Sequence, residues 1–150
     1  MKRAKPRRRF VARASQIHQR GVFAEVPIKR GTRLIEYTGE RISHAQASRR
    51  YRDDDSTHTF LFALDDEVID ATHGGNSSRW INHSCAPNCE SVEVDGRVFI
   101  EAIRDIRPGD ELTYDYRMFL EERHTPALKR EFRCNCGARR CRGTLLFSKR

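Results

Sequence analysis

Apolar residues in this chain occur in short runs separated by polar turns, a pattern typical of β-strands rather than long helices. Residues 21–42 place β-branched and aromatic side chains on both sides of a Lys-Arg-Gly turn at 29–31. Residues 60–70 predict two further strands around Asp65-Asp66. The pattern therefore predicts a mainly β fold.

Local signals also predict one hairpin and one short helix. Residues 91–103 predict a hairpin, because Asp95-Gly96 suits a type I′ turn. Residues 44–51 predict a short polar helix that Ser43 caps and that the acidic run at 53–55 ends.

The remaining segments carry weaker signals. Residues 119–129 have room for a short helix or a mobile linker, and Pro126 disfavours a long helix. Residues 28–31 and 106–109 resemble each other, and we interpret them as similar turns rather than a repeat. No apolar run approaches the length of a membrane span, and no apolar segment follows the basic N-terminus, so we expect an intracellular protein.

The net charge of +8 over 150 residues is unevenly distributed. Residues 1–9 carry six Lys or Arg and no acid, and residues 129–150 carry eight against one acid. The stretch between them has 15 basic and 20 acidic residues. Such asymmetry favours ends that contact polyanions and a body that attracts a cationic ligand, although solvated basic termini explain the ends equally well.

Five cysteines in a reducing compartment favour a metal site over disulfides. Three of them, Cys134, Cys136 and Cys141, lie within eight residues and need one more ligand to complete a tetrahedral zinc site. Cys85 and Cys89 are candidates for the fourth ligand, followed by His83 and His124. The alternative is a set of unrelated thiols.

Two further groups of polar residues are ambiguous when taken alone. Tyr114 and Tyr116 are two apart on a predicted strand, so both phenols are expected on one face, where they could line a pocket or simply pack. Asn82-His83-Ser84 could form part of a site or a turn whose side chains bond to the backbone.

Taken together, these pieces resemble the SET-domain protein lysine methyltransferases, in order from about His18 to Leu145. The motifs are RGVFA, EYTGE, DATHGGNSSRWINHSCAPNCE, GDELTYDY and CNCGARRCRGTL. The resemblance implies a mainly β SET-domain (β-clip-like) fold with a pseudoknot, few short helices and a zinc-binding post-SET segment. It also implies a basic arm (1–9), a SET domain (10–117), a linker or short helix (118–132) and the post-SET segment (133–150).

The resemblance further implies that the NHSC and ELTYDY segments together form an active site, with S-adenosylmethionine entering one side and the target lysine the other. The implied cofactor residues are His18, Arg20, Gly21, Val22, Phe60, Asn82, His83, Tyr116 and Asn135. The implied lysine-channel residues are Tyr37, Tyr114 and Tyr116, with Tyr116 as the catalytic tyrosine and Phe60 or Trp80 as aromatic walls. The implied zinc ligands are Cys85, Cys134, Cys136 and Cys141, which leaves Cys89 as a buried thiol.

Two positions depart from the family pattern. Gln19 stands where many relatives have Gly, so the backbone there is less free to take positive φ. Trp80 replaces the more usual Phe.

Tyr114 places a hydroxyl where relatives limit the number of methyl groups, which predicts mono- or dimethylation.

We expect the substrate to be a lysine in a basic segment of a histone or another nucleic-acid-associated protein, with nucleic-acid contact through the basic termini and no membrane partner. The location could be cytoplasmic or, with chromatin, nuclear. One rival interpretation is a catalytically silent SET module that binds basic peptides or nucleic acid. Another is a different zinc-stabilised nucleic-acid binder.

Overall fold

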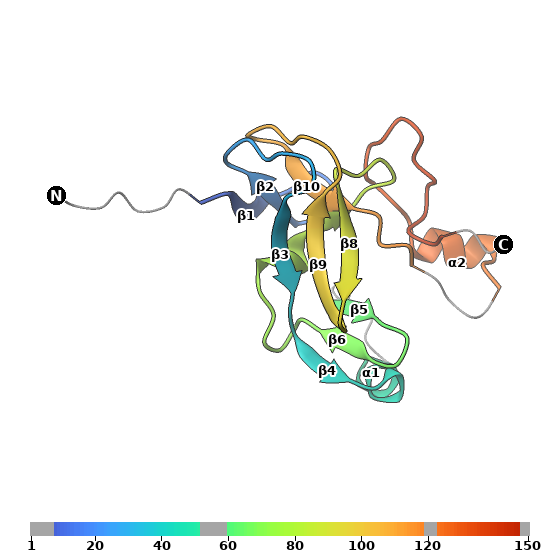
Figure 1. The fold of residues 1–150 in the computed structure, drawn as a ribbon. Helices are drawn as coiled ribbons and strands as arrows, with labels where there is room; N and C mark the ends of the chain where they lie inside the picture. The colour runs from blue at the N-terminus through green and yellow to red at the C-terminus, as the bar shows by residue number, and fades with distance from the viewer. Residues whose placement is uncertain (1–7, 52–59, 119–122, 148–150) are drawn as a thin grey trace.

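The computed structural model describes residues 8–51, 60–118 and 123–147, which form strands and a few short helices (Figure 1). The strands are β1 (Phe10–Ala14), β2 (Arg20–Ala24), β3 (Arg33–Tyr37), β4 (Glu40–Ile42), β5 (Leu61–Ala63), β6 (Val68–Asp70), β7 (Asn82–His83), β8 (Cys89–Val94), β9 (Arg97–Ala102) and β10 (Glu111–Tyr114). The helices are α1 (His44–Arg50), the 3-10 turn η1 (Ser77–Trp80) and α2 (Pro126–Glu131). The expected mainly β fold is confirmed.

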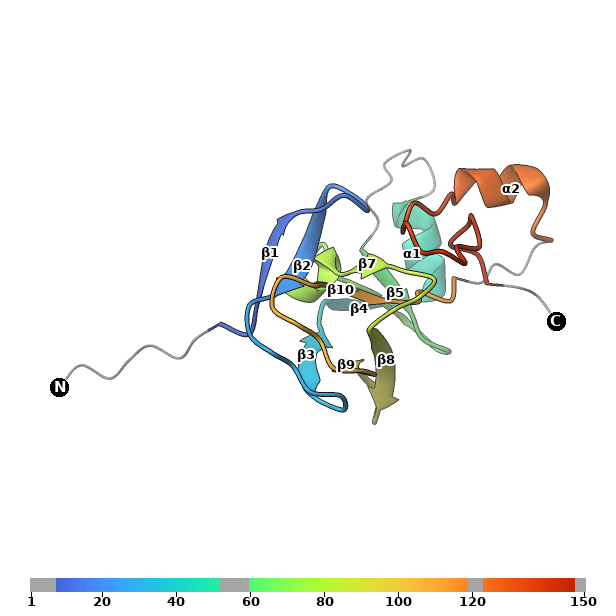
Figure 2. The same cartoon turned by 90° about the horizontal axis from the view of Figure 1, so that it is seen from above.

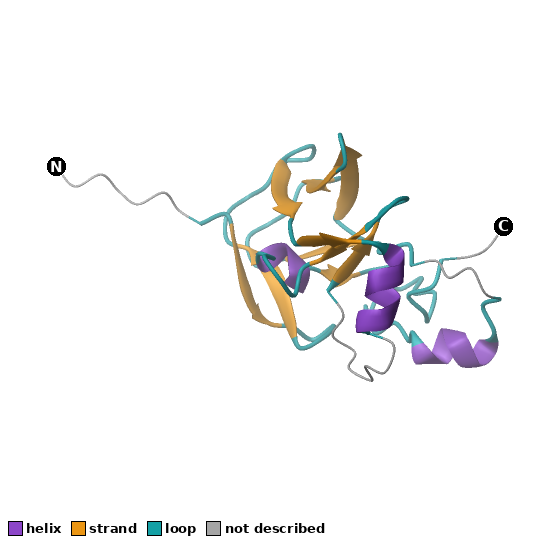
Figure 3. Ribbon diagram, turned by 90° about the horizontal axis from the view of Figure 1, so that it is seen from below, coloured by secondary structure: helices purple, strands orange, loops and turns teal. Residues whose placement is uncertain are grey.

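Two sheets organise these strands. The larger sheet has the order β1-β2-β10-β8-β9-β3, with β7 paired to β10, and the smaller sheet has the order β4-β6-β5. The turn η1 packs among the strands, against β1, β2 and β3, whereas α2 is grouped with the C-terminal segment at one end (Figures 2 and 3). Within the described ranges no helix is long and apolar enough to cross a bilayer.

The predicted turns take the expected geometry. Asp95 and Gly96 both have positive φ, 51° and 76°, as a type I′ turn between β8 and β9 requires. The two similar turns at 28–31 and 106–109 lie side by side, because Ile28 and Ile106 exchange backbone hydrogen bonds of 2.9 and 2.8 Å.

The predicted helix α1 begins at a capping box. The Ser43 hydroxyl accepts from the backbone of Gln46, and the Gln46 side chain accepts from the backbone of Ser43. The acidic run at 53–55, which was expected to end α1, lies outside the described residues. Helix α2 falls inside the segment where a short helix or linker was expected, with Thr125 as its N-cap and Pro126 in its first turn.

Remote strands meet where NHSC and ELTYDY come together. β7 runs parallel to β10, with Asn82 opposite Thr113 and His83 opposite Tyr114. Beneath this junction lies the main hydrophobic core, in which Ile81, Ile100, Ile106 and Leu112 are almost fully buried. The core therefore fixes the backbone from which the polar residues of both motifs project.

Candidate active site and metal centre

Two tyrosines meet where β7, β8 and β10 converge. β10 ends at Tyr114, so the expectation that one strand carries both Tyr114 and Tyr116 is wrong. Their rings nevertheless pack together, with centroids 4.8 Å apart and planes tilted by 49°. The pairing of β10 with β7 ends here, and the chain past the strand turns the second phenol toward the first.

The phenol of Tyr116 is held by backbone. Its hydroxyl donates a hydrogen bond of 2.5 Å to the carbonyl oxygen of Ile81, and its backbone N–H donates to Nδ1 of His83 at 3.1 Å. Burial raises the pKa of Tyr116 well above its usual value, and the nearby Tyr37 phenol and Glu111 carboxylate raise it further. Tyr116 is therefore a neutral phenol with a fixed orientation.

A third phenol, that of Tyr37 at the end of β3, lies near the other two. Burial raises its pKa above the usual range, and the charge of Asp70 raises it further. Burial likewise raises the pKa of Tyr114, and the neighbouring phenols of Tyr116 and Tyr37 raise it further. The structure thus brings together the three tyrosines that were predicted to line a lysine channel, all in the neutral form.

The side-chain amide of Asn82 reaches back to the N-terminal loop. Its nitrogen lies 3.2 Å from the carbonyl oxygen of His18, 2.8 Å from that of Arg20, 3.2 Å from the Ser15 hydroxyl and 2.9 Å from the Glu111 carboxylate. An amide NH₂ has two hydrogens, so acceptors outnumber donors here. This concentration of oxygen atoms suits a positively charged ligand group.

The Glu111 carboxylate also accepts a hydrogen bond from the Ser15 hydroxyl, with oxygen–oxygen distances of 2.7 and 2.9 Å. Its position accounts for the absence of a side chain at residue 21. A Cβ on Gly21 would collide with the Glu111 carboxylate. The neighbouring Val22 side chain is in the main core, so only its backbone can border a ligand. Gln19 lies outside the left-handed region, because only Asp95 and Arg117 among the described non-glycine residues have positive φ, and the departure at this position costs no backbone strain.

The predicted aromatic walls form a layered arrangement of rings and guanidinium groups. Phe60 and Trp80 make an edge-to-face pair with centroids 4.9 Å apart. Arg79 lies 5.5 Å from the Phe60 ring and 5.1 Å from the Trp80 ring, and Arg20 approaches Trp80 at 5.3 Å. Phe60 also packs against the cluster that contains Tyr37, so this wall adjoins the phenols.

Four cysteines form the second centre. The sulfur atoms of Cys85, Cys134, Cys136 and Cys141 all lie within 4.8 Å of one another. Cys85 Sγ is 3.9 Å from the sulfurs of both Cys134 and Cys141. Zn–S bonds of about 2.3 Å at tetrahedral angles separate the sulfurs by about 3.8 Å, so these residues fit a zinc ion.

The surrounding backbone supports the same assignment. Backbone N–H groups of Cys85, Arg142 and Gly143 point at sulfurs of the cluster, at 3.5, 3.4 and 3.3 Å, which stabilises thiolates. Cys89 lies outside the cluster and is 1% exposed, and burial raises the pKa of its thiol to about 12. It is the buried thiol that was expected.

An ion pair joins the metal centre to the tyrosines. Asp115, between Tyr114 and Tyr116, accepts two hydrogen bonds from the Arg142 guanidinium, at 2.7 and 3.2 Å. His83 Nδ1 lies 3.5 Å from the same carboxylate. Burial lowers the pKa of His83 to about 4, which the Asp115 charge opposes and Arg142 assists. The imidazole is therefore neutral.

Sequence reasoning missed several of these residues. Glu111, Asp115 and Ser15 were not assigned roles, although the first two lie inside a quoted motif. Their partners are remote in sequence, so no local spacing marks them. Asn135, predicted to bind cofactor, lies exposed between two cysteines of the cluster.

Comparison with known proteins agrees with this arrangement. Residues 19–117 match the SET domain. The chain belongs to the SET-domain family. This chain is 43% identical over 148 residues to histone-lysine N-methyltransferase TRX1 of Oryza sativa subsp. japonica, a match that covers 93% of this chain. It is 42% identical to human histone-lysine N-methyltransferase 2B over an alignment of 135 residues, which covers 85% of this chain.

The chain spans only a small part of these relatives, 14% of the rice protein and 5% of the human one. A solved structure, ctPRC2 in an autoinhibited conformation bound to S-adenosylmethionine, matches 71% of this chain and 15% of its own, with 36% identity and a TM-score of 0.64. The SET fold that the motifs predicted is confirmed.

Proposed function

We propose that this SET domain transfers a methyl group from S-adenosylmethionine to the ε-amine of a lysine in a protein. The observation that carries the proposal is the neutral Tyr116 phenol, fixed by Ile81 and packed against Tyr114 beside His83. Relatives named as histone-lysine N-methyltransferases and a solved neighbour bound to S-adenosylmethionine support it.

The phenols suit a reaction that depends on alignment. Methyl transfer from a sulfonium to an amine is an in-line displacement, in which orientation alone can supply about 7–11 kcal/mol. Tyr116 cannot be the general base, because its hydroxyl stays protonated: the hydroxyl donates a hydrogen bond to the Ile81 carbonyl oxygen, and burial raises its pKa. It orients the reacting groups and offers lone pairs to developing positive charge.

The same ring cluster favours the reactive form of the substrate. A lysine with a pKa of about 10.4 is neutral only about 0.04% of the time at pH 7. Burial among Tyr37, Tyr114 and Tyr116 disfavours the ammonium form and lowers that pKa. The amine then loses its proton to water before it attacks.

The oxygen atoms around Asn82 suit the methyl donor. When bound, S-adenosylmethionine supplies a methyl carbon activated by positively charged sulfur, and its amino group adds a second positive charge. The carbonyls of His18 and Arg20, with the Glu111 carboxylate, would hold that amino group. The side chains of Arg20, Phe60 and Trp80 would border the rest of the S-adenosylmethionine molecule.

For the substrate we propose a lysine in a basic histone-like segment. Relatives from Emericella nidulans and Candida albicans are named as H3 lysine-4 specific. The excess of acidic residues between 10 and 128 would attract such a segment. A histone substrate would place the protein with chromatin.

The test is incubation with labelled donor and a panel of histones and other basic proteins, followed by mapping of the modified lysine. The wild-type chain should label a lysine, and a folded Tyr116→Phe variant should lose about a hundredfold or more in rate, as removal of one fixed stabilising group does elsewhere. Undiminished labelling by that variant would refute the role of Tyr116. A folded wild type that binds basic peptides but never labels them would instead support the silent module.

A further inference from the structure

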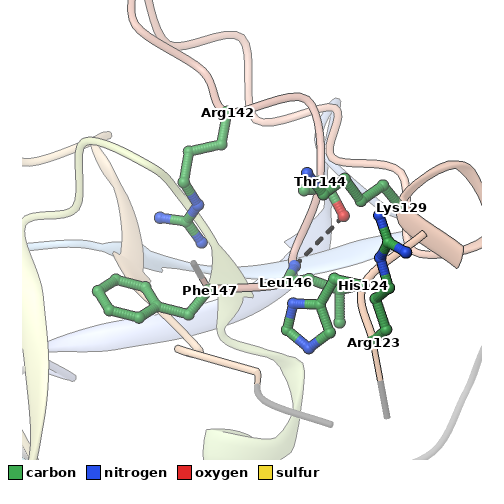
Figure 4. Close-up of a pocket in the computed structure, with 7 residues that line it drawn as sticks. All are labelled: Arg123, His124, Lys129, Arg142, Thr144, Leu146 and Phe147. Atoms are coloured by element: carbon green, nitrogen blue, oxygen red, sulfur yellow. Dashed lines mark hydrogen bonds between the residues drawn. The ribbon is translucent and has the colours of Figure 1, made fainter. Parts of the chain in front are cut away.

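A hollow of about 560 Å³ lies between α2 and the C-terminal segment (Figure 4). Arg142 connects its lining to the phenol cluster through the hydrogen bonds to Asp115. Its lining residues are Arg123, His124, Lys129, Arg142, Thr144, Leu146 and Phe147. None of them belongs to the phenol cluster or to the loop around Asn82. The proposed function therefore leaves this hollow without a role.

The lining is basic and, among the described residues, contains no acid. Arg142 is paired with Asp115, which leaves Arg123 and Lys129 as the available charges. Both are exposed, and within residues 8–51, 60–118 and 123–147 neither forms an ion pair with an acid. Adjacent positive charges of this kind attract an anion.

Phe147 places an aromatic ring at the rim of the same hollow. Its side chain is 42% exposed, so one face of the ring is open to a ligand, and among the described residues Val94 is the other exposed large apolar side chain. The guanidinium groups of Arg142 and Arg117 lie 5.4 and 5.9 Å from its ring centroid. An exposed ring bordered by cations is a platform on which a nucleic-acid base stacks while phosphates are held nearby.

We propose that this hollow binds single-stranded nucleic acid, with an unpaired base on Phe147 and phosphates on Arg123 and Lys129. A volume of about 560 Å³ suits one base and its phosphate rather than a longer segment. A duplex hides its base faces by stacking, so only an unpaired base can use the ring. The chain continues onto further exposed cations of this region, namely Arg130, Arg133, Arg139 and Arg140.

The first test measures binding of a labelled oligothymidylate to the full chain by fluorescence anisotropy. Phe147→Ala should weaken binding about tenfold, the effect of losing one stacked base. The matched control is Phe99→Ala, which removes a ring flanked by Arg33 at 4.1 Å and Arg97 at 5.1 Å on β9, outside the hollow. An abasic strand of the same length should bind the wild type more weakly and should not respond to Phe147→Ala.

The second test separates phosphate contacts from general attraction to the basic ends. Lys129→Ala should reduce the slope of log affinity against log salt by about 0.7, the value for one phosphate contact on a single strand. Lys29→Ala, which removes another exposed lysine outside the hollow, should leave the slope unchanged. The N-terminal basic arm contributes equally to every variant.

Three results would overturn the proposal. The first is equal affinity of the Phe147→Ala and Phe99→Ala variants for oligothymidylate. The second is equal affinity of the wild type for the abasic strand and for oligothymidylate. The third is an acidic peptide that displaces labelled oligothymidylate as well as unlabelled oligothymidylate does. Neither methyl donor nor lysine substrate is present in these assays, so their outcome is independent of the proposed methyl transfer.

Discussion

At the scale of single residues, the site relies on hydroxyl groups whose positions are fixed by burial or by backbone. Tyr116 is oriented by the carbonyl oxygen of Ile81, while Tyr114 is 5% exposed and is held by packing in the main core, with its ring against Tyr116. A hydroxyl beside the amine can accept a hydrogen bond from it and occupy space that further methyl groups need. The two phenols therefore have separable roles: Tyr116 affects the rate of methyl transfer, and Tyr114 affects the number of methyl groups in the product.

Tyr114→Phe should shift the product from mono- or dimethyl-lysine toward higher methylation, because it removes that hydroxyl while keeping the ring. Mass spectrometry of the methylated substrate measures the shift. Tyr51→Phe is the matched control, since the Tyr51 hydroxyl bonds to Asp70 outside the phenol cluster. An unchanged product distribution in Tyr114→Phe would show that its hydroxyl does not limit the product.

Arg142→Lys should loosen the C-terminal segment while the cysteine cluster keeps its four thiols. Lysine cannot reproduce the two parallel hydrogen bonds to Asp115, a pair only 17% and 24% exposed. We expect about tenfold faster hydrogen exchange at Leu145 and Phe147, whose amides bond to Phe132 and Met118.

Arg97→Lys is the control for this change, because Arg97 makes a similar two-bond pair with Glu36 but is 60% exposed. Exposed ion pairs contribute little, so exchange in the C-terminal segment should not change. If Arg142→Lys also left that exchange unaltered, the Asp115 pair would not hold the segment in place.

At the scale of elements, helix α1 is attached to the small sheet through one buried carboxylate. Asp70, at the end of β6, is 0% exposed and accepts from the Tyr51 hydroxyl at 2.6 Å, Arg50 at 2.9 Å and the Thr72 backbone at 3.0 Å. Burial alone would raise the pKa of Asp70, but these hydrogen bonds outweigh it and hold the pKa below its usual value.

Asp70→Asn should lower the free energy of unfolding at neutral pH by about 1.5–3 kcal/mol, the range for hydrogen bonds to a charged group. Because the folded pKa is depressed, the contribution of Asp70 is complete above the unfolded value of about 3.9 and is lost as pH falls through the folded pKa. The wild type should therefore lose more stability than Asp70→Asn on acidification below about pH 4.

Urea unfolding at several pH values measures both effects. Glu67→Gln provides the comparison, since the Arg41–Glu67 pair is exposed and should contribute less than about 1 kcal/mol. Equal stabilities of the two variants at neutral pH would exclude an anchoring role for Asp70.

Elements with local signals were predictable from sequence, and elements defined by remote pairing were not. Asp95-Gly96 and Ser43 act within a few residues, so the hairpin and the start of α1 follow from the sequence. The end of β10 at Tyr114 depends on Asn82 and His83, about thirty residues away, and nothing near Tyr116 announces it. Family motifs identified the phenols and the cysteines, whereas Glu111 and Asp115 are single acids whose roles depend on distant partners.

At the scale of the whole molecule, the C-terminal segment is attached to the SET domain at few points. Among the described residues they include the cysteine cluster through Cys85, the Asp115–Arg142 pair, a bridge between Met118 and Leu146, and the Arg117 guanidinium over the Phe147 ring. Few residues of the segment are buried, so packing alone contributes little to its position. The large sheet, in contrast, has its own apolar core.

Zinc removal should therefore release residues 133–147 while leaving the large sheet folded. Without a cation the four clustered thiols cannot all be thiolates, because their charges repel each other. Hydrogen exchange during titration with a chelator should show loss of protection at 133–147 and retained protection in β8 and β9. Donor affinity, measured by calorimetry, should fall over the same chelator range if the segment borders the donor site.

Two cysteine variants sharpen this test. Cys141→Ala should abolish stoichiometric zinc binding and reproduce the effect of the chelator. Cys89→Ala should retain zinc, because its thiol is buried in the core and apart from the cluster. Donor affinity that persists after complete removal of zinc would mean that the two centres function independently, and cooperative loss of the whole sheet with the metal would mean that zinc stabilises the entire domain rather than its C-terminal segment.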